Sequence, residues 1–380
     1  MVFSGKALYD SGVFSEIAED VSDLVTLISP SETDFLNMLS APMQPAYNVL
    51  HEWLEDKLRP NSVVTSTAVG STTAVSSVTI HDGSGNTVAH ALQVGMVLVM
   101  PFGEYVQVTA VSGDDVSFRR AQASTSATSY GAGVTVEVLS TAELEGADVS
   151  GDYSLARVRK TNYCQIFKTD VIVSGTVEAT RKLGGISSEF DYQRQLRMRE
   201  LLRDLEKAVI RGKSFGNTLG SASAYRTFNG VLNQITTNVT SVGSLTQAAL
   251  DAAIKAAWVR GGFKSGRGVI LADANWKLEI DSYNNSRIQV QQPDPAFRQN
   301  IMTYENAFGS FEVHLNRWMP ANSAVVLEPA RVKVLPLSGR SFQFKPVATT
   351  GDSSRGILLG EYTVEVAGED GMAKLHKGVI

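Results

Sequence analysis

Serine, histidine and carboxylate residues at a few places in the chain have spacings that occur in catalytic sites. The run GKSFG, Gly212 to Gly216, matches the GxSxG pattern around the nucleophilic serine of many hydrolases. That serine requires a strand before it and a helix after it, whereas the sequence predicts a helix before Ser214 and a loop after it. Glu52 and Asp56 have the spacing of one helix face, which we interpret as a solvated or partner-facing pair. We therefore expect no catalysis at either place.

Metal, phosphate and disulfide chemistry also lack the residues that they require. His51 begins the run HEWLE but has no second histidine four positions on, so a zinc-binding helix is excluded. The run from Gly261 to Arg267, GGFKSGR, faintly resembles a phosphate-binding loop, but no strand precedes it and we interpret it as a helix-ending turn. Cys164 is the single cysteine, which excludes an intramolecular disulfide and a CxxC metal site. The sequence thus predicts no cofactor, no metal and no enzymatic activity.

The element with the clearest pattern is a long helix from Phe190 to Lys213. Ser188 can cap its start with Asp191 three residues on, and Gly212 is a stop signal. At ~1.5 Å per residue the helix is roughly 35 Å long. One apolar stripe on a helix of that length predicts a spine against which sheets pack. The stripe consists of Met198, Leu201, Leu202, Leu205 and Val209.

Composition limits the class of protein. The 380 residues, 43% of them hydrophobic, suffice for two or three domains, or for one domain with an insertion, and argue against disorder. The net charge of −5 and the charged fraction of only 19% argue against a nucleic-acid binder. No apolar run reaches the ~18 residues of a membrane span, and the N-terminus lacks the pattern of a secretory signal peptide. We expect a protein of cytoplasmic origin without membrane association.

The chain before the spine divides by composition into three parts. Residues 1–60 form an arm with short helical patterns, broken by proline, and with too little apolar surface to close a core alone. Residues 61–150 predict an inserted small β-barrel or sandwich, because β-rich runs alternate with turn signals at even spacing. Residues 151–186 form a partly extended loop that leads into the spine. The β-rich runs are VSSVTIHD, GMVLVMP, YVQVTAV, DVSFRRA and GVTVEVL.

The chain from residue 187 onward predicts an α+β arrangement. The spine helix lies in residues 187–224, a helix-and-strand domain in residues 225–325 and closing strands in residues 326–380. A second helix is expected from Ser244 to Val259, with Ser244 and Gln247 forming its capping box.

One later segment, SFEVHLNRWMP, alternates between apolar and polar residues as a half-buried strand does. Its alternation places the side chains of Phe311, Val313 and Leu315 inward.

Five stretches resemble, in order, tailed-phage major capsid proteins of the Hong Kong 97 type, and among these the SU-ten-like major capsid family. They are ISPSETDFLNML with HEWLEDKL, NYCQIFKTDVIVSGT, the spine with its RDLEKAVIRGK end, GSFEVHLNRWMP, and ATTGDSSRGILLGEYTVEV. The resemblance runs through nearly the whole chain, although Asp34 stands where the family often has proline. It implies the Hong Kong 97-type capsid fold, with N-terminal arm, extended loop, spine helix of a peripheral domain and axial domain, here with the inserted β-barrel or sandwich.

The resemblance implies a structural major capsid protein that self-assembles into the icosahedral head shell around double-stranded DNA. Its partners would be identical subunits in pentamers and hexamers, a portal protein, and decoration or scaffolding proteins, with no sequence-specific DNA binding and no membrane. It would be located in the virion after assembly in the host cytoplasm. No long cleavable segment precedes the arm, so we expect any scaffold to be a separate protein. Candidate inter-subunit contacts are Trp53, Leu54, Leu58, Arg157, Arg159, Lys160, Lys168 and Arg181.

Other interpretations of the same sequence stay open. An encapsulin-like nanocompartment shell would share the fold but enclose a cargo enzyme. A non-capsid, secreted β-rich binding protein would need a signal peptide that the sequence lacks, and an enzyme would need a convergent polar pocket. The nucleic-acid content of purified particles, size exclusion and an activity screen distinguish these classes.

Overall fold

The computed structural model describes residues 33–39, 44–71, 76–81, 92–148, 156–180, 186–216, 219–283, 302–349 and 351–378. The chain divides into two compact units. The first unit is Met1–Trp53 with Thr161–Ile380, and the second is Leu54–Lys160. The insert expected at residues 61–150 lies within the second unit.

The first unit is built on helix α3, Glu189–Arg211, the spine expected from the sequence. The hydroxyl of Ser188 accepts a hydrogen bond from the backbone N–H of Asp191 at 3.2 Å, and Gly212 caps the other end by donating its N–H to the carbonyl of Ala208. Both predicted helix ends are therefore confirmed. The apolar stripe is buried at Leu201, Leu205 and Val209, and Ile210 extends it.

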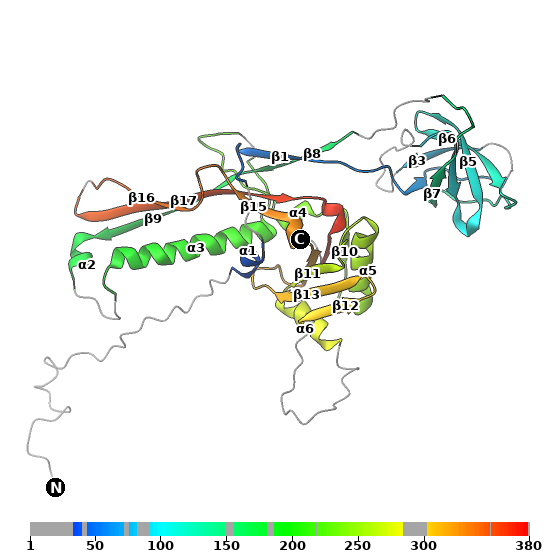
Figure 1. Cartoon of the computed structure of the whole chain (residues 1–380). Helices are drawn as coiled ribbons and strands as arrows, with labels where there is room; N and C mark the ends of the chain where they lie inside the picture. Colours follow the sequence, from blue (N-terminus) through cyan, green and yellow to red (C-terminus); the bar gives the residue numbers. More distant parts are fainter. Residues whose placement is uncertain are drawn as a thin grey trace, which may run out of the picture. The chain divides into compact units, whose positions relative to one another are not determined.

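A four-stranded sheet covers the apolar face of α3. Strand β17, Ser353–Val366, lies at its centre and pairs in antiparallel register with all three neighbours. α3 runs along β9 and β17 (Figure 1), and the side chains between helix and sheet form one buried cluster. The other strands are β9 at Gln165–Ser174, β15 at Val332–Pro336 and β16 at Gln343–Pro346.

A six-stranded mixed sheet forms the rest of the first unit, with α5, Gln247–Val259, and α6, Ala274–Ser282, packed on it. Strand β11, Arg267–Ala272, is central and buried from Gly268 onward, as expected for a continuous apolar run. The remaining strands are β10 at Val239–Ser241, β12 at Thr303–Asn306, β13 at Gly309–Leu315, β14 at Ser323–Leu327 and β18 at Ala373–His376. The closing strands of residues 326–380 are thus shared between the two sheets.

Two local predictions in this region are wrong. Thr246, and not Ser244, caps α5, because its side chain accepts the hydrogen bond from the backbone N–H of Ala249. Phe311 and Val313 are buried as expected, but Leu315 is exposed because it is the last residue of β13, beyond the sheet interior.

The second unit is a closed β-barrel with strand order β2-β3-β6-β5-β4-β7, which confirms the inserted barrel. The valine-rich alternation of each run puts every second side chain inside. Each of the five predicted runs forms a strand, and β2 closes the barrel against β7. The strands are β2 at Ser62–Thr65, β3 at Ser76–His81, β4 at Met96–Val99, β5 at Tyr105–Ser112, β6 at Asp115–Gln122 and β7 at Thr135–Thr141.

A two-stranded ribbon of β1, Leu50–Glu55, and β8, Val158–Tyr163, contains both points at which the chain passes between the units. The helical spacing of Glu52 and Asp56 does not correspond to a helix, since β1 is a strand and Asp56 lies just after it. Short helical turns complete the described chain: α1 at Asp34–Met38, η2 at Pro101–Gly103, α2 at Gly175–Ala179, α4 at Val231–Gln234, η3 at Pro329–Arg331 and η4 at Glu369–Gly371.

Candidate assembly surfaces

The predicted arm is held on its own chain at α1. Phe35 is fully buried in the cluster between α3 and the four-stranded sheet. The carboxylate of Glu206 on α3 accepts hydrogen bonds from the backbone N–H groups of Phe35 and Leu36, at 3.1 and 3.2 Å, and from the amide of Asn316 at 2.9 Å. This part of the arm therefore does not lie on a neighbouring copy, because its apolar side chain already fills its own core.

Glu206 has an unusual environment for a carboxylate. It is fully buried, and the three groups that donate hydrogen bonds to it are neutral. Burial raises the pKa of Glu206, and the hydrogen bonds from Phe35, Leu36 and Asn316 offset that rise only in part. The residue acts as an anchor for α1.

The apolar contact candidates lie on or just after β1. Leu54 is 62% exposed and Leu58 is 93% exposed. The indole of Trp53 is half-buried and stacks on the ring of His51 at 5.8 Å between centroids. Two leucines close to each other along the chain are therefore available to a partner, whereas Trp53 is partly used within the ribbon.

The basic contact candidates are less available. Arg157 pairs with Asp56 at 3.2 Å and Lys168 with Asp170 at 3.5 Å, all four being solvent-exposed. Such exposed ion pairs contribute little free energy. Of the remaining candidates, Arg159 is exposed and Lys160 half-buried on β8, and Arg181 lies outside the described residues.

A cleft of about 730 Å³ opens in the first unit between residues 44–52 and strand β15. One wall carries Tyr47 and Leu50, and the other carries Val332 and Leu335. At its rim the carboxylate of Glu365 binds His51 Nε2 at 2.9 Å and Lys333 Nζ at 2.8 Å. The hydrogen bond with His51 contributes most to lowering the pKa of Glu365, and the hydrogen bond and positive charge of Lys333 add to it, whereas burial opposes it.

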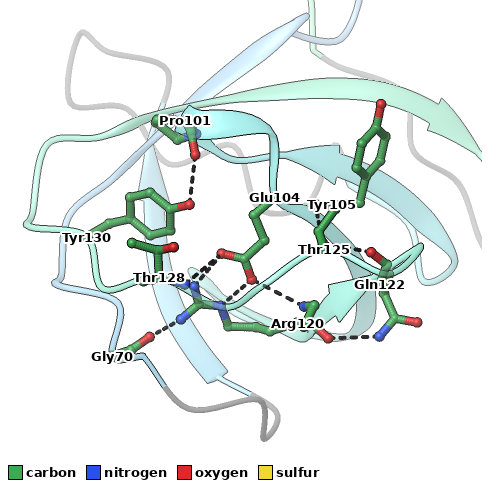
Figure 2. Close-up of polar contacts among 10 residues, drawn as sticks. Gly70, Pro101, Glu104, Tyr105, Arg120, Gln122, Thr125, Thr128 and Tyr130 are labelled. Atoms are coloured by element: carbon green, nitrogen blue, oxygen red, sulfur yellow. Dashed lines mark hydrogen bonds and ion pairs between the residues drawn. The ribbon is translucent and has the colours of Figure 1, made fainter.

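One end of the barrel is organised by a buried ion pair (Figure 2). Arg120 donates from Nε to Glu104 Oε1 at 2.9 Å and from Nη2 to Glu104 Oε2. Its guanidinium also donates to the carbonyls of Gly70 and Thr128. The side chains of Arg120 and Glu104 are almost completely buried. Three connections between strands are thereby joined at a single guanidinium.

The electrostatics of this pair differ from those of Glu206. Burial alone would raise the pKa of Glu104, but the hydrogen bond from Arg120 and the backbone N–H groups of Ala121 and Thr128 bring it below the ordinary value. The carboxylate therefore stays ionised, and the pair is fully hydrogen-bonded, as a buried charge requires.

The residues considered for catalysis form no reactive arrangement. The hydroxyl of Ser214 donates to the carbonyl of Thr227 at 3.0 Å, and its N–H donates to Asn229 Oδ1 at 2.8 Å, in a loop that follows α3. Within the described ranges, no three His, Cys, Asp or Glu side chains gather as metal ligands would, and none of the helices combines the length and apolar content needed to cross a bilayer.

Sequence reasoning missed Glu206 and the Arg120–Glu104 pair. A signal for Arg120 was present, because it has the same parity along β6 as the inward-facing Val116 and Phe118. Glu206 lies one turn after Leu202 and next to Leu205 on the apolar face of α3. In both cases a charged residue at an inward-facing position of a helix or strand was the signal for a buried polar contact.

The model of the SU10 major capsid protein family matches residues 5–379 of the chain. No curated protein matches the chain. The capsid of an empty GTA particle has a similar fold, with TM-score 0.52, 9% identity, and 99% of this chain and 100% of that chain covered. A structure from Mycobacterium phage Bobi has TM-score 0.48 and 12% identity, with 97% of this chain and 98% of that chain covered. The holo-SrpI encapsulin complex of Synechococcus elongatus gives TM-score 0.42 and 14% identity over 58% and 77%.

Proposed function

Because the chain belongs to the SU10 major capsid protein family, we propose that its copies close into pentamers and hexamers of a tailed-phage head through the ribbon β1–β8. The chain is a structural protein of the capsid shell, with the Hong Kong 97-type fold. Identical subunits assemble side by side in such a shell, and their contacts must form closed rings.

The exposed leucines beside the ribbon carry the proposal. An isolated two-stranded sheet is marginally stable in water, and β1 pairs with β8 alone in that sheet. Leu54 and Leu58 add apolar surface that the described part of their own unit leaves in solvent. Burying a leucine side chain contributes about 1.5–3 kcal/mol, so a neighbouring copy laid over both would stabilise ribbon and contact together. Arg157, Arg159 and Lys160, which lie beside or on β8, would flank this contact and set its orientation.

The domain roles follow the same proposal. Residues 1–60 would be the arm, 61–150 the inserted barrel, 151–186 the extended loop and 187–224 the spine. Residues 225–325 would form the axial domain together with β18, and strands β15, β16 and β17 of residues 326–380 would close the peripheral domain. Shell assembly would take place in the host cytoplasm, with a portal protein at one vertex and decoration or scaffolding proteins as separate chains. The shell would enclose double-stranded DNA without base-specific contacts, and the chain would catalyse no reaction.

The experiment is the double substitution Leu54→Asp with Leu58→Asp. We expect at least a tenfold loss of closed shells by electron microscopy, with the soluble subunit recovered at the monomer position in sedimentation. Leu144→Asp is the matched control, because Leu144 is 84% exposed in the same unit and lies outside the ribbon. Normal shells from the double variant would contradict the proposed contact.

The contents of particles purified from the expressing cell also distinguish a phage head from an encapsulin-like shell. Double-stranded DNA inside the particles supports the phage head. Particles that hold a cargo enzyme and no nucleic acid would support a nanocompartment.

A further inference from the structure

The large apolar side chain of Phe102 lies in solvent and contributes little to the barrel core. It is 93% exposed, at the turn η2 between β4 and β5. Its backbone has φ +65°, a left-handed conformation that is rare for a bulky residue. Its ring lies nearly parallel to that of Tyr130, with 6.3 Å between centroids and 13° between planes. A large apolar side chain is thus held in solvent by a strained backbone.

The strain is concentrated at this end of the barrel. Six non-glycine residues in the described part of the chain have left-handed φ, and four of them are here. Ala121 donates its N–H to Glu104, and Tyr105 donates its N–H to Thr125, so the strained segments are side by side (Figure 2). Strained backbone persists only where its surroundings over-determine it, and it clusters at functional sites. The four residues are Phe102, Ala121, Ala123 and Ser124.

The buried network supplies that over-determination. Arg120 binds Glu104, Gly70 and Thr128, and the hydroxyl of Tyr130 donates to the carbonyl of Pro101 at 2.7 Å. The turn that carries Phe102 is therefore fixed from both flanks. A buried ion pair does not usually stabilise more than apolar residues would. Here its hydrogen bonds hold three surface connections together. A preorganised surface loses less conformational entropy on binding.

The segment that lies beside the Phe102 turn is uncharged. No charged residue occurs between positions 121 and 134, where serine, threonine and alanine predominate. Copies of a chain with net charge −5 repel one another, so a contact between copies is favoured where each contributes no charge. Two copies of such a neutral segment can meet without like-charge repulsion, as a two-fold contact between identical surfaces requires.

We propose that this end of the barrel, formed by Phe102 and residues 121–130, makes an isologous contact with the same end of the barrel in a second copy. The contact rests on the proposed assembly into a shell and adds the surface by which inserted barrels of two subunits meet. Phe102 is its anchor, and hydroxyl groups of the serine and threonine residues form its rim.

The test is Phe102→Cys in the full-length chain, purified as shells. Cys164 is fully buried, so F102C introduces an accessible thiol into a chain whose one other cysteine is protected. Mild oxidation of the shells is expected to convert most F102C subunits to disulfide-linked dimers on a non-reducing gel. Leu139→Cys, at a 52% exposed position on β7, is the control and should stay monomeric. F102C shells that remain monomeric while a maleimide labels the introduced thiol would overturn the proposal.

Two further outcomes also decide it. If F102C blocks assembly while L139C assembles, Phe102→Tyr is expected to restore shells because it keeps the ring. Failure of Phe102→Tyr as well would mean that the position serves folding, and the contact is rejected. Absence of shells from the unmodified chain would refute the proposed function itself, and this contact with it.

Discussion

Each unit contains a buried carboxylate, but the groups that donate hydrogen bonds to it are charged in one unit and neutral in the other. In the barrel, Glu104 faces the guanidinium of Arg120 and its pKa is lowered. On the spine, Glu206 faces neutral donors from Phe35, Leu36 and Asn316, and burial raises its pKa. The barrel thus keeps an ion pair inside to fix three connections, whereas on the spine a carboxylate held by neutral donors fixes one short helix.

The largest effect is expected from breaking the barrel pair. Glu104→Ala leaves the guanidinium of Arg120 buried without its counter-ion, and removal of one partner of such a pair costs about 3–5 kcal/mol. Urea unfolding of the second unit, followed by hydrogen exchange in β5 and β6, measures the loss. Glu104→Leu combined with Arg120→Met should recover most of it, because an apolar pair of similar volume is nearly neutral. An unchanged midpoint in Glu104→Ala would show that the pair does not hold the barrel end.

A smaller, local effect is expected on the spine. Glu206→Ala removes the acceptor of two backbone N–H groups and of the Asn316 amide, at a cost of about 1–3 kcal/mol. Faster hydrogen exchange should be confined to residues 33–39, while β9 and β17 keep their protection. Asp204→Ala is the control, since Asp204 is exposed on the same helix. Global unfolding of the unit would contradict the assignment of Glu206 as an anchor of α1 alone.

The two carboxylates should respond to pH with opposite sign. The raised pKa of Glu206 means that its contribution is greatest below 4.5, the value expected for the unfolded chain, and is lost as the pH rises through the folded pKa. The lowered pKa of Glu104 means that its contribution is complete above 4.5 and is lost as the pH falls through the folded pKa. The free energy of unfolding of the first unit should therefore include a contribution from Glu206 that decreases from pH 5 to pH 8, whereas the contribution of Glu104 to the barrel should change little. Urea unfolding of Glu206→Gln at both pH values should lack that decrease, and its persistence would assign the response to another group.

The smallest effect is expected at Phe102. Phe102→Gly relieves a left-handed backbone, which disfavours L-residues by about 1–2 kcal/mol, although glycine loses more entropy on folding. The barrel should be unchanged or more stable by up to about 1 kcal/mol in thermal unfolding. Gly103→Ala is the opposite change at the next position, where φ is +81°, and should destabilise. A clear loss of stability in Phe102→Gly would show that the ring has a folding role.

The sequence predicts those parts of the fold that follow from periodicity. The spine, its Ser188 cap and its Gly212 end could be derived because helix spacing and capping chemistry are local. The barrel strands could be derived because the alternation of valines is also local. Strand β1 could not be derived in this way, because the charges of HEWLED do not distinguish the period of a helix from that of a strand. Its strand conformation depends on pairing with β8, about 100 residues later in the chain.

The candidate surfaces were predicted less well, for a physical reason. Leu54 and Leu58 were found as apolar residues without a local partner, and both are exposed. Phe35 has the same character in the sequence but is buried, because the acceptor that holds its helix comes from residue 206. Contacts between residues so far apart, like the turn conformation of Phe102, have no signature within a short window of sequence.

Copies of this chain are proposed to join through the ribbon and its exposed leucines. Site-specific photo-crosslinking from position 58 in purified shells, with mapping of the joined peptides, tests this contact. Position 58 is expected to be joined to a different copy, so that the product has twice the subunit mass. Crosslinks confined to the same chain, in shells that are intact by electron microscopy, would contradict it.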